Sequence, residues 1–179
     1  MAPMRFTELE LPGSYAIDVE AHEDVRGHFA RIFDGKEFAE RGLHAQWAQV
    51  SVAFNKEWGT LRGLHFQEEP YAEAKLVRCI RGSLHDVIVD LRAESPTYRR
   101  WAAVELSAAN GRMVYVPEGL AHGYLTLEDE TEALYLISEP YAPEAASGVR
   151  WNDPAFDIDW PSDPRVMSDK DKAWPDFKD

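Results

Sequence analysis

We predict an all-β fold, a jelly-roll barrel with short peripheral helices, because three features of the sequence agree. Short segments rich in Val, Ile, Leu and Tyr recur along the chain. Turn signals separate these segments at intervals of about 8–12 residues, which is typical of β-sandwiches and barrels. The chain of 179 residues is long enough for one complete core, and no repeat or linker divides it. We therefore expect a single domain over residues 1–179.

The expected strands are short and separated by turns, as in a jelly roll. Asn110-Gly111, which lies between two of them, is a typical hairpin signal. A barrel of the cupin type suits this pattern, and its open end is a natural pocket. In chain order, the strands are expected at residues 13–19, 29–33, 46–54, 58–67, 75–80, 84–91, 101–106, 113–116, 123–127 and 133–138.

Two short helices are expected outside the barrel. Residues 36–41 can form a helix that stops at Gly42. Ser168, followed by Asp171, has the form of a helix N-cap with an acid at the third helical position. The chain after Gly148 is otherwise expected to be mostly loop.

The charge of the chain restricts the partners that it can have. The net charge is −13 at pH 7, which argues against a general affinity for nucleic acid or an anionic membrane. An anionic small ligand is compatible with this charge if positive charge gathers locally. Basic residues do gather in the middle of the chain, and this cluster is either solvated surface or a phosphate site. Its members are Arg62, Lys75, Arg78 and Arg81.

Other features of the composition favour a cytoplasmic protein. No apolar run approaches the ~20 residues needed to span a bilayer, and residues 1–10 lack the apolar region of a signal peptide. Cys79 is the one cysteine, so neither an internal disulfide nor a zinc pattern can form. We expect Cys79 to be a small core residue.

The stretch from Trp58 to Gln67 brings a cation, an imidazole and an amide close together. In a strand, successive side chains point to opposite faces. His65 and Gln67 would then share one face. Arg62 would look the other way unless the chain bends at Gly63, which glycine permits. Taken alone, the stretch is either a half-buried strand with a satisfied histidine or part of a functional site.

A series of motifs follows one order from about residue 13 to the C-terminus. They are Arg26-Gly27 with Phe29, Arg62-Gly-Leu-His65-Phe-Gln67, Lys75-Leu-Val-Arg-Cys79, Asp86-Val-Ile-Val-Asp-Leu-Arg92, Ser95-Pro-Thr-Tyr98, Val116-Pro-Glu-Gly119, Ala121-His122-Gly123, Tyr135 with Tyr141, Trp151-Asn-Asp-Pro154, Trp160-Pro161 and Ser168-Asp-Lys-Asp171. In these motifs and in their order, the chain resembles the dTDP-4-dehydrorhamnose 3,5-epimerase family. The resemblance implies a cupin jelly roll, no metal, and a homodimer in which an N-terminal strand is exchanged between subunits.

The resemblance implies epimerisation at C3 and C5 of dTDP-4-keto-6-deoxy-D-glucose, which gives dTDP-4-keto-L-rhamnose. The C4 ketone of this sugar acidifies the protons on C3 and C5. The reaction needs a base that removes a proton, a group that holds the enolate oxygen and an acid that returns a proton to the opposite face. It needs no redox cofactor. The use that the family most commonly implies is L-rhamnose for cell-surface polysaccharide.

Four residues match the catalytic positions of the family. His65 corresponds to the base, and an imidazole ordinarily titrates at about pH 6.5. Asp171 corresponds to the aspartate that orients the base, and its alternative is a helix cap. Lys75 would stabilise the enolate beside O4, and its alternative is a surface charge. Tyr135 corresponds to the acid on the opposite face, and its alternative is strand packing.

The resemblance also implies which residues bind the substrate. Arg26 matches a phosphate-binding arginine, and a guanidinium suits bidentate contact with phosphate. Phe29 and Tyr141 would border the thymine ring, where flat aromatic faces can stack. Arg62 would assist Lys75 or hold the diphosphate. The remaining candidates for the substrate pocket are Gln49, Gln67, Asp86 and His122, the last as a support.

We expect no metal and no other cofactor. Many cupins bind a metal through a His-x-His pair and a later Glu. Here the equivalent region is His65-Phe66-Gln67, with one histidine, and His122 alone is a poor second ligand.

Two positions depart from the family pattern. Glu73 precedes the lysine motif where Gln is more usual, and Arg31 stands where Glu is common. Neither position belongs to the expected acid–base set. The alternatives to a 3,5-epimerase are an epimerase that acts at C3 or C5 alone, a 3,4-ketoisomerase on a related nucleotide sugar, and a non-catalytic sugar-binding jelly roll. The last should have lost His65 or Tyr135, and this chain keeps both.

Overall fold

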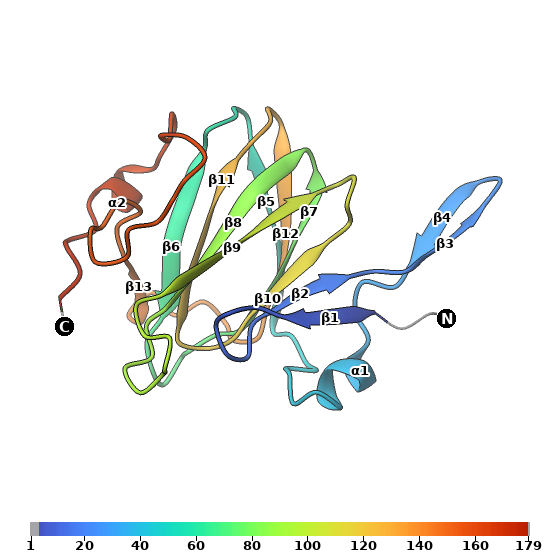
Figure 1. Ribbon diagram of the computed structural model, residues 1–179, viewed down its shortest axis with the longest axis horizontal. Coiled ribbons are helices and arrows are strands. Elements are labelled where there is room, and N and C mark those ends of the chain that lie inside the picture. Colours follow the sequence, from blue (N-terminus) through green and yellow to red (C-terminus); the bar gives the residue numbers. More distant parts are fainter. Residues whose placement is uncertain (1–3, 179) are drawn as a thin grey trace.

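Two antiparallel β-sheets face each other and form the body of the protein (Figure 1). The computed structural model describes residues 4–178. Strands that are neighbours in a sheet are mostly distant in sequence, so the chain crosses repeatedly between the sheets, as in a jelly roll. The prediction of an all-β jelly roll with short peripheral helices is confirmed.

The order of the strands follows from their hydrogen-bonded pairing. In the larger sheet the spatial order is β1 (Arg5–Glu8), β2 (Tyr15–Asp18), β10 (Met113–Val116), β7 (Lys75–Arg81), β12 (Thr131–Ile137) and β5 (Gln49–Asn55). In the smaller sheet it is β13 (Ala146–Gly148), β6 (Leu61–Gln67), β11 (Leu120–Thr126), β8 (Ser83–Asp90) and β9 (Trp101–Ser107). Strands β3 (Ala21–Asp24) and β4 (Gly27–Ala30) form a separate hairpin.

Apolar side chains from both sheets fill the space between them. Strand β7 shows how alternation places them: Val77 and Cys79 point into this core, whereas Leu76 packs into a second cluster on the outer face. The helix α1 (Gly35–Ala39) adds Phe38 to that outer cluster, where it is completely buried. Cys79 is also fully buried, so its expected place in the core is confirmed.

Both expected helices are present, and each has a capping side chain. Asp34 caps α1 by accepting the N–H groups of Lys36 and Glu37. Ser168 caps α2 (Asp169–Lys172), because its Oγ accepts the N–H of Asp171 at 3.1 Å. Among the described helices, none combines the length and the apolar character that crossing a membrane requires.

The structure also corrects the sequence-based description. Strands β1, β3 and β13 were not expected, because they are very short and lie at a sheet edge or in the hairpin. The expectation of a hairpin at Asn110-Gly111 is wrong, because β9 and β10 belong to different sheets. The turn does exist, and Asn110 Oδ1 accepts the N–H groups of Ser107 and Arg112. It carries the chain from one sheet to the other.

The β3–β4 hairpin projects away from the two sheets (Figure 1). Val25, in its turn, is fully exposed, and the Phe29 side chain is 65% exposed. An extended arm with apolar side chains in solvent is unusual for an isolated chain, because burial of such side chains lowers the free energy of the protein.

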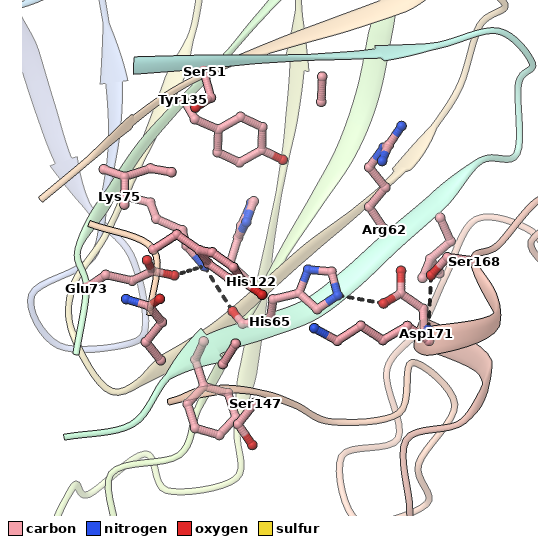
Figure 2. Close-up of a pocket in the computed structure, with 18 of the residues that line it drawn as sticks. Ser51, Arg62, His65, Glu73, Lys75, His122, Tyr135, Ser147, Ser168 and Asp171 are labelled. Carbon is pink, nitrogen blue, oxygen red and sulfur yellow. Dashed lines mark hydrogen bonds and ion pairs between the residues drawn. The ribbon is translucent and has the colours of Figure 1, made fainter. Parts of the chain in front are cut away.

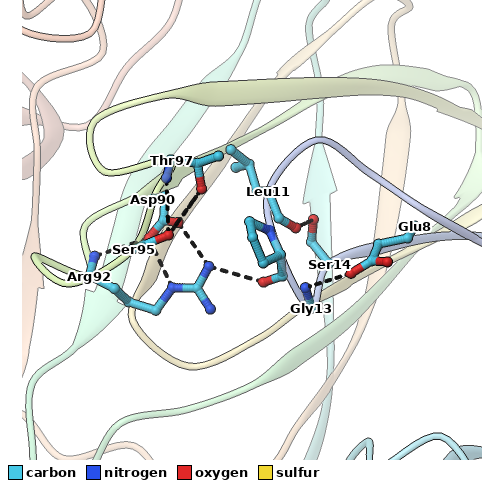
Figure 3. A network of polar contacts seen from close by, with 9 residues as sticks. Glu8, Leu11, Gly13, Ser14, Asp90, Arg92, Ser95 and Thr97 are labelled. Atoms are coloured by element: carbon cyan, nitrogen blue, oxygen red, sulfur yellow. Dashed lines mark hydrogen bonds and ion pairs between the residues drawn. The ribbon is translucent and has the colours of Figure 1, made fainter.

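The loop after β8 is organised around a buried carboxylate, that of Asp90 (Figure 3). It accepts hydrogen bonds from the Arg92 guanidinium and from the hydroxyls of Ser95 and Thr97. Burial alone would raise the pKa of Asp90, but these bonds outweigh it and lower the pKa to about 2. Arg92 also donates to the carbonyl of Pro12 at 3.0 Å, which ties the N-terminal segment to this end of the barrel.

Candidate active site

A pocket of about 650 Å³ opens between the two sheets, lined by strands of both and by residues that lead into α2 (Figure 2). The larger sheet contributes β5, β7 and β12, and the smaller sheet contributes β6, β11 and β13. All four expected catalytic residues line the pocket. So do the binding candidates Gln49, Arg62, Gln67, His122 and Tyr141.

His65 and Asp171 form a hydrogen-bonded pair in the pocket wall (Figure 2). Nε2 of His65 lies 2.6 Å from Oδ1 of Asp171, and Oδ2 accepts the N–H of Gly63 at 3.3 Å. Burial acts to raise the pKa of Asp171, but the bonds from His65, Gly63 and Ser168 outweigh it and leave the pKa below its usual value. A carboxylate only accepts hydrogen bonds, so the neutral imidazole carries its proton on Nε2 and its lone pair on Nδ1.

Strand β6 brings Arg62 and His65 together through a bulge at Gly63. His65 pairs with His122 on β11. Arg62, three residues earlier, pairs with Tyr124, which is two residues further along β11, so β6 contains one extra residue. Gly63 has a φ of +123°, and a Cβ there would come within 2.6 Å of the β11 backbone. The extra residue turns Arg62 to the side of His65. This is the bend at Gly63 without which the two side chains would point to opposite faces.

Lys75 reaches towards His65 from the opposite sheet. Its Nζ donates to the carbonyl oxygen of His65 at 3.0 Å and forms an ion pair with Glu73 at 2.9 Å. The side chains of Lys75 and Glu73 are 8% and 10% exposed, so the pair is nearly removed from water. Two of the three ammonium donors are thereby occupied, and one is left for a ligand. The carboxylate of Glu73 thus neutralises the lysine that it precedes.

Tyr135 faces the pocket from β12, on the sheet opposite His65 (Figure 2). Its ring packs edge-on against His122, with 5.8 Å between ring centroids. Burial first, and then the neighbouring Tyr124 and Asp86, raise the pKa of Tyr135 well above its usual value. Tyr135 therefore keeps its proton at neutral pH, as a proton donor must.

His122 and Asp86 form a second, buried pair beside Tyr135. The atoms Nε2 of His122 and Oδ2 of Asp86 are 2.8 Å apart, and both side chains are almost completely buried. Burial raises the pKa of Asp86, although the contact with His122 opposes this shift. Asp86 itself lies behind His122 and is not among the described residues that line the pocket.

Two glutamines hold the segment that carries Tyr141. The Oε1 atom of Gln67 accepts the N–H of Ala142 at 2.7 Å, and its amide donates to the carbonyls of Tyr71 and Pro140. Gln49 Oε1 accepts the N–H of Tyr141 at 3.1 Å. The Tyr141 side chain is left exposed at the edge of the pocket.

Arg26 and Phe29 are not brought to this pocket by their own chain. Both belong to the β3–β4 hairpin and are absent from the described residues that line the pocket. Arg26 is highly exposed and forms an ion pair with Asp24 at 2.5 Å. Arg31, the other departure from the family pattern, forms an ion pair with Asp34, the N-cap of α1.

Sequence reasoning missed some residues of the pocket. Ser51 pairs with Tyr135 in the register between β5 and β12, and it lies two positions from Gln49. Strand alternation from Gln49 would therefore have found Ser51. Lys170 precedes Asp171, and its ammonium lies 5.5 Å from the Trp174 ring centroid. Its place in the Ser168–Asp171 motif was the available signal.

The described side chains of the pocket provide acid–base chemistry. A histidine oriented by a carboxylate lies on one wall, a protonated tyrosine lies on the other, and a lysine reaches between them. Across residues 4–178, His, Cys, Asp and Glu side chains form no group of three or more that is suited to a metal ion.

The fold and the pocket together define a jelly-roll protein of the cupin type with acid and base groups on opposing walls. The chain belongs to the dTDP-4-dehydrorhamnose 3,5-epimerase family, whose model matches residues 8–179. The resemblance inferred from the motifs is therefore confirmed.

Individual members of the family are similar over nearly the whole chain. The dTDP-4-dehydrorhamnose 3,5-epimerase of Sinorhizobium fredii is 42% identical over 96% of this chain and 89% of its own length. That of Methanothermobacter thermautotrophicus is 44% identical over 97% and 95%. The crystal structure of the Bacillus anthracis enzyme, with TDP and pyrophosphate bound, superposes with a TM-score of 0.94 at 38% identity and covers 98% of this chain and 100% of its own.

Proposed function

We propose that this protein is an isomerase that inverts C3 and C5 of dTDP-4-keto-6-deoxy-D-glucose to give dTDP-4-keto-L-rhamnose. Family membership and the similarity to enzymes of that name support the reaction. The single observation that carries it is the opposition of His65 and Tyr135 across one pocket, since inversion needs a base and an acid on opposite faces of a carbon.

The first half of the reaction is the removal of a proton beside the ketone. The lone pair on Nδ1 of His65 takes the proton from C3 or C5, and the electron pair of the C–H bond moves to form an enolate with its charge on O4. Asp171 holds the ring and stabilises the imidazolium that results. The remaining N–H donor of Lys75 stabilises the oxygen of the enolate.

The second half returns a proton to the opposite face. The Tyr135 hydroxyl donates its proton to the carbon, the ketone re-forms at C4, and the configuration of that carbon is inverted. Solvent then takes the extra proton from the His65 imidazolium and returns a proton to Tyr135, and the same groups can act on the second carbon. No oxidation state changes in either half, so the chemistry needs no redox cofactor.

We also propose that the nucleotide end of the substrate lies at the exposed edge of the pocket. Arg62 is held there by bonds from Nε to Asn55 Oδ1 at 2.8 Å and from Nη2 to the Phe54 carbonyl at 3.2 Å. A guanidinium fixed in this way suits a diphosphate, and TDP and pyrophosphate are bound in the Bacillus anthracis enzyme. Tyr141 offers a flat face to the thymine. A substrate of this class fits a cytoplasmic enzyme.

We propose that the working form is a homodimer in which each hairpin completes the pocket of the partner. Two observations support this form. The β3–β4 hairpin projects away from the two sheets (Figure 1), and its residues Arg26 and Phe29 are absent from the described residues that line the pocket. Alternate residues of the edge strand β5 expose a row of apolar side chains that a second copy would bury. These residues are Val50, Val52 and Phe54.

The function is tested by following the ring protons of the sugar in heavy water by NMR. Deuterium at both C3 and C5, with inversion at both carbons, supports the proposal. Label and inversion at C3 or C5 alone would indicate the restricted epimerase, and the appearance of a 3-keto sugar would indicate a ketoisomerase. The absence of any exchange would contradict an enzymatic role with this substrate.

A further inference from the structure

A chain of hydrogen bonds runs behind the pocket from Arg62 to Tyr124, which packs beside Tyr135. Nε of Arg62 donates to Oδ1 of Asn55 at 2.8 Å. Nδ2 of Asn55 donates to the hydroxyl oxygen of Tyr124 at 3.1 Å. Tyr124 in turn packs beside Tyr135, with 6.5 Å between the ring centroids and 35° between the ring planes, and the two hydroxyls interact electrostatically. An exposed cation at the rim is thus linked to the tyrosine that faces the reacting carbons.

The directions of these bonds are determined by the donors at the two ends. Arg62 can only donate, so the amide of Asn55 must turn its oxygen to Arg62 and its nitrogen to Tyr124. The same nitrogen also donates to the carbonyl of Thr131 at 3.0 Å, which fixes this orientation of the amide. Tyr124 therefore accepts from Asn55, and its own proton is left with a long bond of 3.3 Å to Asn55 Oδ1.

Tyr124 is completely buried, and it is absent from the described residues that line the pocket, so it cannot touch a substrate. It nevertheless packs directly beside Tyr135. Burial disfavours the phenolate that Tyr135 becomes after it gives up its proton. A hydrogen-bond donor beside that oxygen would reduce this cost, and the O–H of Tyr124 is engaged only in its long bond of 3.3 Å to Asn55.

We propose, on the basis of the function above, that Tyr124 is a positioning residue for Tyr135. In the resting site, Tyr124 accepts the hydroxyl of Tyr135 and fixes its place opposite His65. When Tyr135 has transferred its proton to carbon, the O–H of Tyr124 rotates from Asn55 to the oxygen of Tyr135 and stabilises it. No further bond forms or breaks, and solvent later returns the proton to Tyr135.

The test separates inversion from simple exchange in heavy water. His65 can remove a proton and return a deuteron to the same face, which labels the recovered substrate without inverting it. Inversion needs the proton from Tyr135. In Tyr124→Phe, which loses one oxygen atom, we expect inversion to slow roughly tenfold. Label in the recovered substrate should appear as fast as in the wild type, so the ratio of exchange to inversion should rise.

Two other variants complete the test. Tyr115→Phe removes another buried tyrosine hydroxyl, one that accepts the N–H of His44 outside the pocket, and it should leave the ratio unchanged. Asn55→Asp supplies a carboxylate that attracts the proton of Tyr124, so it should raise the ratio as Tyr124→Phe does. Asn55→Asp also serves if Tyr124→Phe does not fold.

Two results would overturn the inference. One is an unchanged ratio in Tyr124→Phe with both rates intact, and the other is an equal loss of exchange and inversion, as a purely structural role predicts. If the wild type itself neither exchanges nor inverts, the proposed function fails, and that outcome is distinct from both.

Discussion

Nε2 of His65 lies 2.6 Å from Oδ1 of Asp171, although 106 positions separate the two residues in the chain. The short helix α2 makes this contact possible, because Ser168 rather than Asp171 caps it and leaves the carboxylate of Asp171 to face β6. The sequence left a cap and an orienting carboxylate as alternatives for Asp171. The structure places Asp171 in the first turn of the helix, with its side chain on His65.

We expect Asp171→Asn to lower kcat on the order of 10³-fold with little change in KM, because His65 loses the anion that fixes its proton on Nε2. Steady-state kinetics measure the effect, and thermal unfolding checks that the fold is intact. Asp169→Asn is the matched control, since Asp169 is an exposed acid in the same helix. Similar activity in Asp171→Asn and Asp169→Asn would contradict the assigned role.

The Lys75–Glu73 pair allows catalysis and stability to be separated. Lys75→Met leaves Glu73 buried without a partner, so it should abolish activity and destabilise the fold by about 3–5 kcal/mol. Adding Glu73→Gln removes the stranded charge. The double variant should regain most of the stability, measured by urea unfolding, but none of the activity. Recovery of turnover in the double variant would show that Lys75 does not act on the substrate.

Because of the bulge at Gly63, we expect a substitution at this position to destabilise the protein unusually strongly. Gly63→Ala should destabilise the protein by about 3 kcal/mol or more, because its Cβ would clash with the β11 backbone and its φ is positive. Gly42→Ala is the control for a positive φ without a close neighbour, since Gly42 has a φ of +72° and open space around it. It should cost about 1–2 kcal/mol. Equal losses in chemical unfolding would show that the close approach at Gly63 has no energetic consequence.

Asp90 predicts a specific dependence of stability on pH. Its folded pKa of about 2 lies below the unfolded value, so its contribution is present above about pH 4 and is lost as the pH falls towards 2. The shift corresponds to about 2.5 kcal/mol at neutral pH. Urea unfolding of Asp90→Asn should show a stability gap to the wild type that narrows between pH 5 and about pH 2.5. A gap that does not change with pH would refute the assignment.

The hairpin can be tested by complementation between two inactive chains. One chain carries His65→Asn, and the other carries Arg26→Ala with Phe29→Ala. If each hairpin completes the partner's pocket, a mixed dimer has one intact site, and co-expression should restore roughly a quarter of the wild-type activity. No recovery in dimers that are shown to be mixed would place Arg26 and Phe29 outside the partner's site.

The sequence predicted the repeating pattern of strands well, because buried strands such as β7 and β8 are marked by apolar residues between turn signals. It could not predict the connection at Asn110, since a turn residue closes a turn without stating which sheets it joins. For Arg62, the sequence predicted the wrong side of the strand. Simple alternation placed it away from His65, and the one-residue bulge that reverses this depends on the pairing of β6 with β11.

Some residues of the candidate site could likewise be identified from the sequence, and others could not. Residues with distinctive chemistry in recognisable motifs, such as His65, Lys75 and Tyr135, were found from the sequence and do line one pocket. Ser51 has no distinctive chemistry of its own. Tyr124 resembles any core aromatic residue until its hydrogen bonds are known. A motif also does not show whether a hairpin lies near the pocket of its own chain, so the separation of Arg26 from the pocket is visible only in the structure.

The most direct test of the account is the loss of the C3 and C5 protons of dTDP-4-keto-6-deoxyglucose in heavy water, compared between the wild type and His65→Asn. We predict that the wild type replaces both protons with deuterium and that His65→Asn, correctly folded, replaces neither above the rate without protein. Substantial exchange by His65→Asn at either carbon would show that another group is the base and would contradict the account.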